Sequence, residues 1–106
     1  MLTRDQILQY DDLQREVVPV PEWGGTVQVR VLSGKERAQL VDTAPADFGI
    51  KLAALTVCDE TGKRLFTDSD LNVLGQKSAT ALDRIVSVAL RLNALRAVDV
   101  EAKVKH

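Results

Sequence analysis

The chain has 106 residues, of which 45% are hydrophobic, 27% are charged and only 4% are aromatic. This balance is typical of a globular domain with an aliphatic core, and it argues against a disordered segment. The 14 Lys and Arg residues nearly balance the 15 Asp and Glu residues without forming a basic cluster, so nucleic-acid binding is disfavoured.

Residues 3–12 are predicted to form a short helix. The Thr3 hydroxyl can accept a hydrogen bond from the Gln6 amide while the Gln6 side chain reaches back to Thr3, which is the capping-box pattern. The helix should end at the pair of aspartates that closes this segment. Its apolar side chains are Ile7, Leu8 and Tyr10.

Residues 15–20 and 26–31 predict the two strands of an antiparallel hairpin. Pro19 and Pro21 lack the N–H that a sheet requires, so the first strand should lie at an edge. The Gly24-Gly25 dipeptide is a turn signal. The second strand alternates strictly, which predicts one buried and one solvent-facing side. The expected inward residues are Val27, Val29 and Val31, and the expected outward residues are Thr26, Gln28 and Arg30.

Two helices are predicted to follow the hairpin. A Ser33/Glu36 capping box opens the first, which should run to about residue 42. Pro45 suits the first turn of the second, since its missing N–H has no helical partner there. This second helix should run to about Val57, and it is apolar on nearly all sides, which is typical of a central position in a fold.

The last third of the chain predicts a turn at residues 59–62, a short extended segment at 63–66 and two further helices. Thr67 opens the first with Asp70 as its reciprocal cap, and Gly75 should end it in a left-handed conformation. The second, at residues 78–95, carries an apolar stripe at helical spacing, and residues 97–104 could add a final turn. The stripe consists of Ala81, Ile85, Val88, Leu92 and Leu95.

Together these elements predict a single α+β domain over residues 1–106, with frayed ends near 97–106. An N-terminal antiparallel hairpin packs with a mostly helical C-terminal part. No apolar run approaches the ~20 residues needed to cross a bilayer, and the N-terminus lacks the pattern of a signal peptide. The single cysteine, Cys58, cannot form an internal disulfide, so a reducing cytoplasmic compartment is expected.

The sequence offers no credible catalytic, cofactor or metal site. The only histidine, His106, is the last residue, where an ordered general base is not expected. Cys58 follows an apolar helix and precedes two acids, which is typical of a buried structural thiol. Four acidic residues do not match a calcium loop, and turns and helix caps account for them. They are Asp59, Glu60, Asp68 and Asp70.

Protein binding remains, and it has few candidate residues. Trp23 is the only tryptophan and sits on the hairpin turn. Its ring can either pack over the hairpin or act as an interface anchor, a role in which tryptophan is enriched. The predicted edge strand that contains Val18 and Val20 could accept a further strand. The sequence therefore predicts Val18, Val20 and Trp23 as partner-binding residues.

Several segments, taken in order, resemble the tail assembly chaperones of siphoviruses and prophages. The likeness begins at residues 2–8 and 11–13 and covers most of residues 2–95, with a shorter stretch than in many relatives at 41–48. The segments most similar to this family are VPVPEWGGTV at 18–27, VRVLSGKER at 29–37, CDETGKRLFTD at 58–68 and LGQKSATALDRI at 74–85.

The resemblance implies a non-catalytic protein that binds the tape measure protein and the major tail protein during tail morphogenesis. It also implies action in the host bacterial cytoplasm, absence from the mature virion and no cofactor, nucleic acid or membrane; self-association is possible. Two alternatives stay open: a head–tail connector or tail terminator, and a small regulatory or antitoxin-like adaptor.

Overall fold

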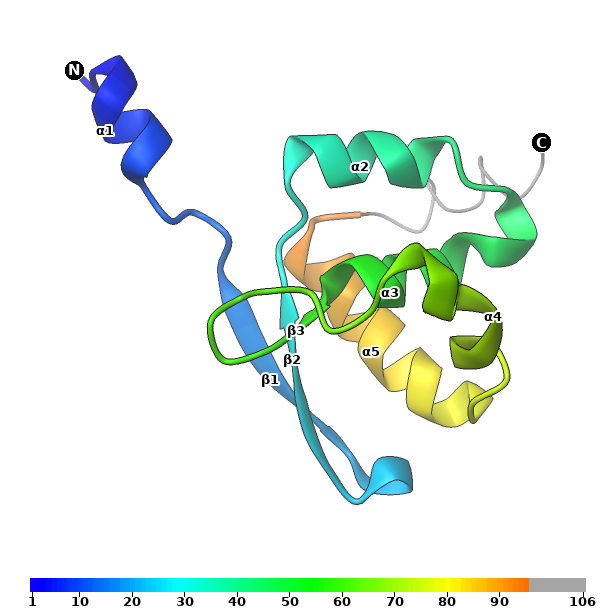
Figure 1. Cartoon of the computed structure of the whole chain (residues 1–106). Coiled ribbons are helices and arrows are strands. Elements are labelled where there is room, and N and C mark those ends of the chain that lie inside the picture. The colour runs from blue at the N-terminus through cyan, green and yellow to red at the C-terminus, as the bar shows by residue number, and fades with distance from the viewer. Residues whose placement is uncertain (96–106) are drawn as a thin grey trace.

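The computed structural model describes residues 1–95, so the predictions for the final turn at 97–104 and for His106 lie outside it. The predicted α+β architecture is confirmed: a three-stranded antiparallel sheet in the order β1-β2-β3 is followed by a mostly helical part (Figure 1). Helix α5 packs against β1 and β2, and α3 packs against α5. In chain order, with η for a 3-10 helix, the elements are α1 (Arg4–Gln9), β1 (Arg15–Val20), η1 (Pro21–Trp23), β2 (Gly25–Arg30), α2 (Gly34–Val41), η2 (Pro45–Asp47), α3 (Phe48–Thr56), β3 (Val57–Cys58), η3 (Asp68–Asp70), α4 (Leu71–Leu74) and α5 (Ala79–Leu92).

Capping boxes open three of the helical segments, as predicted. At Thr3 and Ser33 the hydroxyl accepts from an amide three residues on, and the side chain of that residue accepts from the cap amide. At Thr67 the Asp70 carboxylate accepts from the cap amide, while the Asp70 amide donates to the Thr67 carbonyl. These bonds satisfy donors that a helix start otherwise leaves without partners. The pairs are Thr3 with Gln6, Ser33 with Glu36 and Thr67 with Asp70.

The hairpin also forms as predicted, with β1 at the edge of the sheet. The register pairs Arg15 with Arg30 at one end and Val20 with Gly25 at the other. Gly24 closes the turn with φ +75°, a conformation that glycine adopts without steric cost. The turn itself is the 3-10 helix η1, which places Trp23 immediately before Gly24.

The core lies between the sheet and the two central helices. Residues 51–58 are all buried, which confirms the prediction that this apolar helix is central. Helix α5 buries Ala81 and Ile85 of the predicted stripe against it, together with Ala89 beside the stripe. The largest fully buried side chains are Leu52, Leu55, Ile85, Val20, Val29, Val57 and Thr56.

The end of the central helix was predicted wrongly. Helix α3 stops at Thr56, and Val57 and Cys58 instead form β3, which pairs with Val29 and Gln28 of β2. The free side of β2 carries backbone groups that a buried position cannot leave unpaired, so pairing outweighs a further half-turn of helix. An isolated bridge from Cys58 to Arg64 confirms the extended segment predicted beyond the turn.

Arg30 corrects the prediction that its side of β2 faces solvent. Its side chain is buried and forms an ion pair with Glu36, with contacts of 2.9 and 2.5 Å. The position becomes interior because β3 lies beside β2 and the start of α2 follows closely in the chain. Burial raises the pKa of Glu36, but hydrogen bonds from Arg30 and Ser33 outweigh it and leave that pKa below its usual range.

Gly75 and the end of α5 also differ from prediction. Gly75 has φ −65°, which is right-handed, so it is not a left-handed cap. A Cβ at Gly75 would lie 2.9 Å from Cδ1 of Ile50, so close packing of α4 on α3 accounts for the glycine. Helix α5 ends at Leu92 because the Asn93 side chain turns to accept from the Leu32 amide at 2.6 Å.

Candidate partner-binding surface

Cys58 and the acidic residues have structural roles in the fold. Cys58 is 2% exposed, and burial raises the pKa of its thiol, which suits a packing role. The Asp59 carboxylate accepts hydrogen bonds from the amides of Thr61 and Lys63, so it shapes the turn. Within residues 1–95, no three His, Cys, Asp or Glu side chains are grouped closely enough to hold a metal ion.

Val18 and Val20 lie in the core. Their side chains are 3% and 0% exposed, so a partner that approaches β1 would meet its backbone and its outward side chains. Binding at this strand stays a prediction, now assigned to the edge of β1 and not to the two valine side chains.

Among residues 1–95, the helices are all too short or too polar to span a lipid bilayer.

Trp23 forms part of an apolar hollow of about 540 Å³, which we call the Trp23 hollow. Trp23 as a whole residue is 36% exposed, so it is partly packed on the protein and partly open. Leu65 and Val73 are 51% and 58% exposed beside it. The lining comes from η1, the loop before α4, α4 itself and the turn after it, and consists of Trp23, Leu65, Phe66, Asp70, Val73, Leu74 and Lys77.

The sequence did not single out Leu65 and Val73. Leu71 and Leu74 of α4 turn toward the core, which leaves Val73 on the opposite side of the same short helix. Leu65 lies in an extended segment, where successive side chains point to opposite sides. Because its neighbour Phe66 packs on the core, Leu65 points outward. Identifying Leu65 and Val73 as exposed requires knowing which side of each segment packs on the core, and the sequence alone does not give this.

An ion pair positions the turn that carries Trp23. The single Nε–H of Arg84 on α5 is shared between the two carboxylate oxygens of Glu22 in η1, at 2.9 and 3.1 Å, and Nη2 of Arg84 donates to Oε2 at 3.1 Å. The hydrogen bonds from Arg84 lower the pKa of the Glu22 carboxyl below its usual value. The contact ties the hairpin tip to α5, and Trp23 is the adjacent residue.

This contact predicts that acid changes the environment of Trp23. A carboxyl whose pKa is depressed in the folded protein contributes stability above its unfolded pKa, and that contribution is lost as the pH falls through the folded pKa. As the only tryptophan, Trp23 reports on this turn by fluorescence. We expect its emission to shift as the pH falls through the lowered pKa of Glu22, on the acid side of the ordinary glutamate pKa, while far-UV circular dichroism stays native. In Glu22→Gln the emission should not titrate in this range; a titration unchanged from wild type would contradict the assignment.

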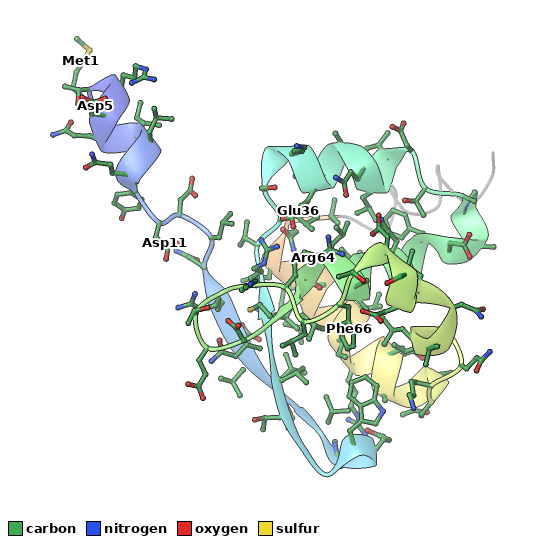
Figure 2. All side chains as sticks on the ribbon, in the orientation of Figure 1. Met1, Asp5, Asp11, Glu36, Arg64 and Phe66 are labelled. Carbon is green, nitrogen blue, oxygen red and sulfur yellow. The ribbon has the colours of Figure 1, made fainter. Side chains whose placement is uncertain are left out.

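Helix α1 forms a second exposed apolar element, the N-terminal arm (residues 1–10). Every residue of the arm is exposed, and it projects from the body on the extended segment before β1 (Figures 1 and 2). Leu8 and Tyr10 are 65% and 75% exposed. The predicted apolar surface of this helix therefore covers nothing in the described chain, and it is available to another molecule.

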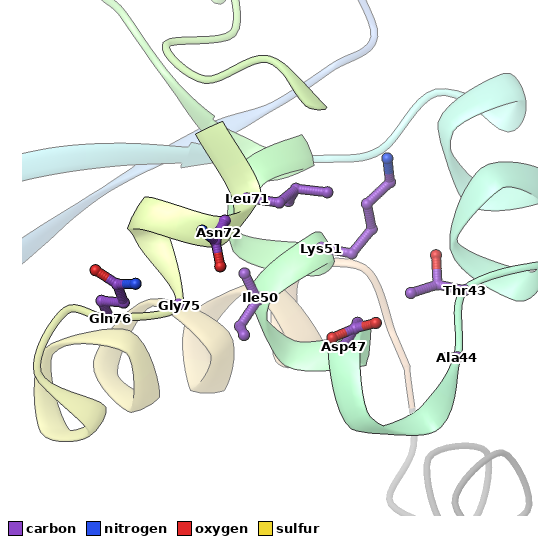
Figure 3. A pocket seen from close by; sticks show the side chains of 9 residues that line it. All are labelled: Thr43, Ala44, Asp47, Ile50, Lys51, Leu71, Asn72, Gly75 and Gln76. Carbon is purple, nitrogen blue, oxygen red and sulfur yellow. The ribbon is translucent and has the colours of Figure 1, made fainter. Parts of the chain in front are cut away.

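A larger hollow of about 610 Å³ lies between η2, α3 and α4 (Figure 3). It is a weaker candidate because its apolar side chains, Ile50 and Leu71, are half-buried in the packing of α3 and α4. Its cation, Lys51, donates to Asp68 at 2.7 Å and is therefore already paired. The Trp23 hollow and the arm expose more apolar surface.

The fold is that of a phage tail assembly chaperone. One solved structure to which the chain is similar is that of the bacteriophage HK97 tail assembly chaperone, with a TM-score of 0.64 and 21% sequence identity. The alignment covers 83% of this chain and 90% of that one. No family model matches the sequence, and no curated protein is significantly similar to it. At the level of the fold, this finding supports the resemblance described above.

Proposed function

We propose that the protein is a phage tail assembly chaperone that binds the tape measure protein and the major tail protein during tail morphogenesis. The observation that carries the proposal is the fold shared with the HK97 chaperone over most of both chains. The role is non-catalytic and belongs to the host bacterial cytoplasm. The protein acts by covering apolar surface of its clients before the tail assembles.

The exposed apolar residues support this role. A protein that holds aggregation-prone clients needs accessible apolar surface, and large patches of this kind are uncommon on monomers without partners. Within residues 1–95, the Trp23 hollow and the N-terminal arm both expose apolar side chains. The chain also has interspersed charges of both signs, which keep a protein with exposed apolar groups in solution.

Co-expression with the tape measure protein tests the function. We expect the wild-type chain to keep the tape measure protein in the soluble fraction and to co-purify with it. Mass spectrometry of purified virions should find no stoichiometric amount of the chain. A stoichiometric presence in virions would overturn the chaperone role in favour of a connector or terminator, and failure to bind either tail protein would overturn the proposal altogether.

Within this function, Trp23→Ala should weaken client binding by about tenfold or more, which is the usual effect of removing an aromatic anchor from an interface. Trp23→Phe keeps an aromatic ring in the hollow and should retain most of the affinity. Circular dichroism of both variants establishes that they are folded, and isothermal titration calorimetry measures the affinity. Equal affinities for wild type and a folded Trp23→Ala would remove the hollow from the interface.

A further inference from the structure

We propose that the outer edge of β1 is a strand-addition site for an extended, proline-free segment of another polypeptide. The proposal rests on the proposed function for the identity of that polypeptide, a tail protein. It adds the mode of binding, which is backbone pairing at a defined set of amides.

The register of the hairpin determines which backbone groups of β1 are free. The Val31 amide donates to the Gln14 carbonyl at 2.9 Å, so these two residues form a hydrogen-bonded pair of the ladder. Such pairs alternate along an antiparallel ladder. The amides and carbonyls of Glu16, Val18 and Val20 therefore point toward β2, and those of the residues between them point to the open edge.

Pro19 agrees with this alternation. It lies at an outward position, where its missing N–H removes no bond to β2. The open edge accordingly offers the N–H and C=O of Arg15, the N–H and C=O of Val17, and the C=O of Pro19. No other strand of the described sheet covers this edge.

A second copy of the chain fits this edge poorly. Two β1 strands paired about Val17 place Pro19 opposite Arg15, so a donor is missing at each end. Sliding the strands one way opposes Glu16 with Glu16 or Arg15 with Arg15, and like charges directly opposite one another are destabilising. Sliding them the other way sets Pro19 against Val17 and loses further bonds. A proline-free segment from a different protein avoids each of these penalties.

The side chains beside the edge indicate what that segment carries. Val17 is 57% exposed, so an apolar residue should lie opposite it on an added strand. The Arg15 guanidinium is not free at this edge, because it lies against the turn after β3, where a Cβ on Gly62 would be 2.4 Å from its Nη1. On its other side Val17 adjoins a hollow of about 480 Å³ over β2 and β3 that also includes Leu65. Leu65 also lines the Trp23 hollow, so one client could contact both surfaces.

Substitution at Val17 tests the proposal because its N–H makes no bond to β2. Val17→Pro removes the central outward donor and leaves the hairpin ladder intact, as Pro19 already does at the next outward position. Val17→Ile keeps the N–H and an apolar side chain and is the matched control. We expect co-purification of the tape measure or major tail protein to fall at least tenfold for Val17→Pro and to change less than twofold for Val17→Ile.

Hydrogen exchange of the wild-type protein gives a measurement that does not depend on a variant folding. The Arg15 and Val17 amides should exchange rapidly in the free chain and become protected in the complex, whereas the Glu16 and Val18 amides should be protected in both. Strand addition would be overturned if the Arg15 and Val17 amides stayed unprotected in the complex, or if a folded Val17→Pro bound the client as well as wild type does. Either result would leave the chaperone function standing. A wild-type chain that captures neither tail protein would overturn the function and this mode of binding together.

Discussion

Glu36→Ala is expected to destabilise the fold by about 3–5 kcal/mol, the usual effect of removing one partner from a buried ion pair. The Arg30 and Glu36 side chains are only 6% and 13% exposed, so the variant leaves a guanidinium buried without its carboxylate. The same substitution removes the acceptor of the Ser33 amide and with it half of a capping box. Urea denaturation followed by circular dichroism measures the loss.

Two controls separate the buried charge from the helix cap. Lys35→Ala changes an exposed residue in the same turn and should alter the free energy of unfolding by less than about 0.5 kcal/mol. Arg30→Met combined with Glu36→Gln removes both charges, and Gln can still accept from the Ser33 amide. This double variant should recover much of the stability lost in Glu36→Ala, because no unpaired charge stays buried. A double variant as unstable as the single one would contradict the charge explanation.

Leu52→Ala should cost about 3 kcal/mol in the free energy of unfolding, within the range measured for buried leucines. Leu52 is fully buried on α3, where the helix packs against α5, and its truncation leaves a cavity in the core. This loss is a large part of the roughly 5–15 kcal/mol by which such a domain is stable. For a domain of this size it corresponds to a fall in melting temperature on the order of 15 °C.

Leu65→Ala is the matched control for this prediction. It removes the same atoms from a side chain that is 51% exposed, and it should cost less than about 1 kcal/mol. Differential scanning calorimetry of the two variants compares identical chemistry at a buried and an exposed site. Similar melting temperatures for both would contradict the placement of Leu52 in the core.

Local signals predicted the parts of this fold that depend on neighbours in the chain. The capping boxes at Thr3, Ser33 and Thr67 each involve residues three apart, so the sequence contains both partners. Pro19 indicated an edge strand because its backbone lacks a donor wherever the strand is placed. These signals need no knowledge of the tertiary structure.

The parts that were missed depend on distant contacts. Strand β3 has only two residues, and its pairing with β2 exists only once the helix that precedes it has packed. Arg30 follows the outward alternation of its strand, yet β3 and α2 enclose it. The same holds for the Trp23 hollow, because Leu65 and Val73 come next to Trp23 only in the folded chain.

The N-terminal arm has a consequence for how tightly and how reversibly a client can be held. A helix as short as α1, without a buried residue, is far below the length at which helices persist in water, so only a fraction of molecules has it formed at any moment. For a client that recognises the helical form, the apparent dissociation constant rises in inverse proportion to that fraction. The hydrogen bonds between Thr3 and Gln6 stabilise the helical form and so raise this fraction, which would lower the apparent dissociation constant without a contact to the client.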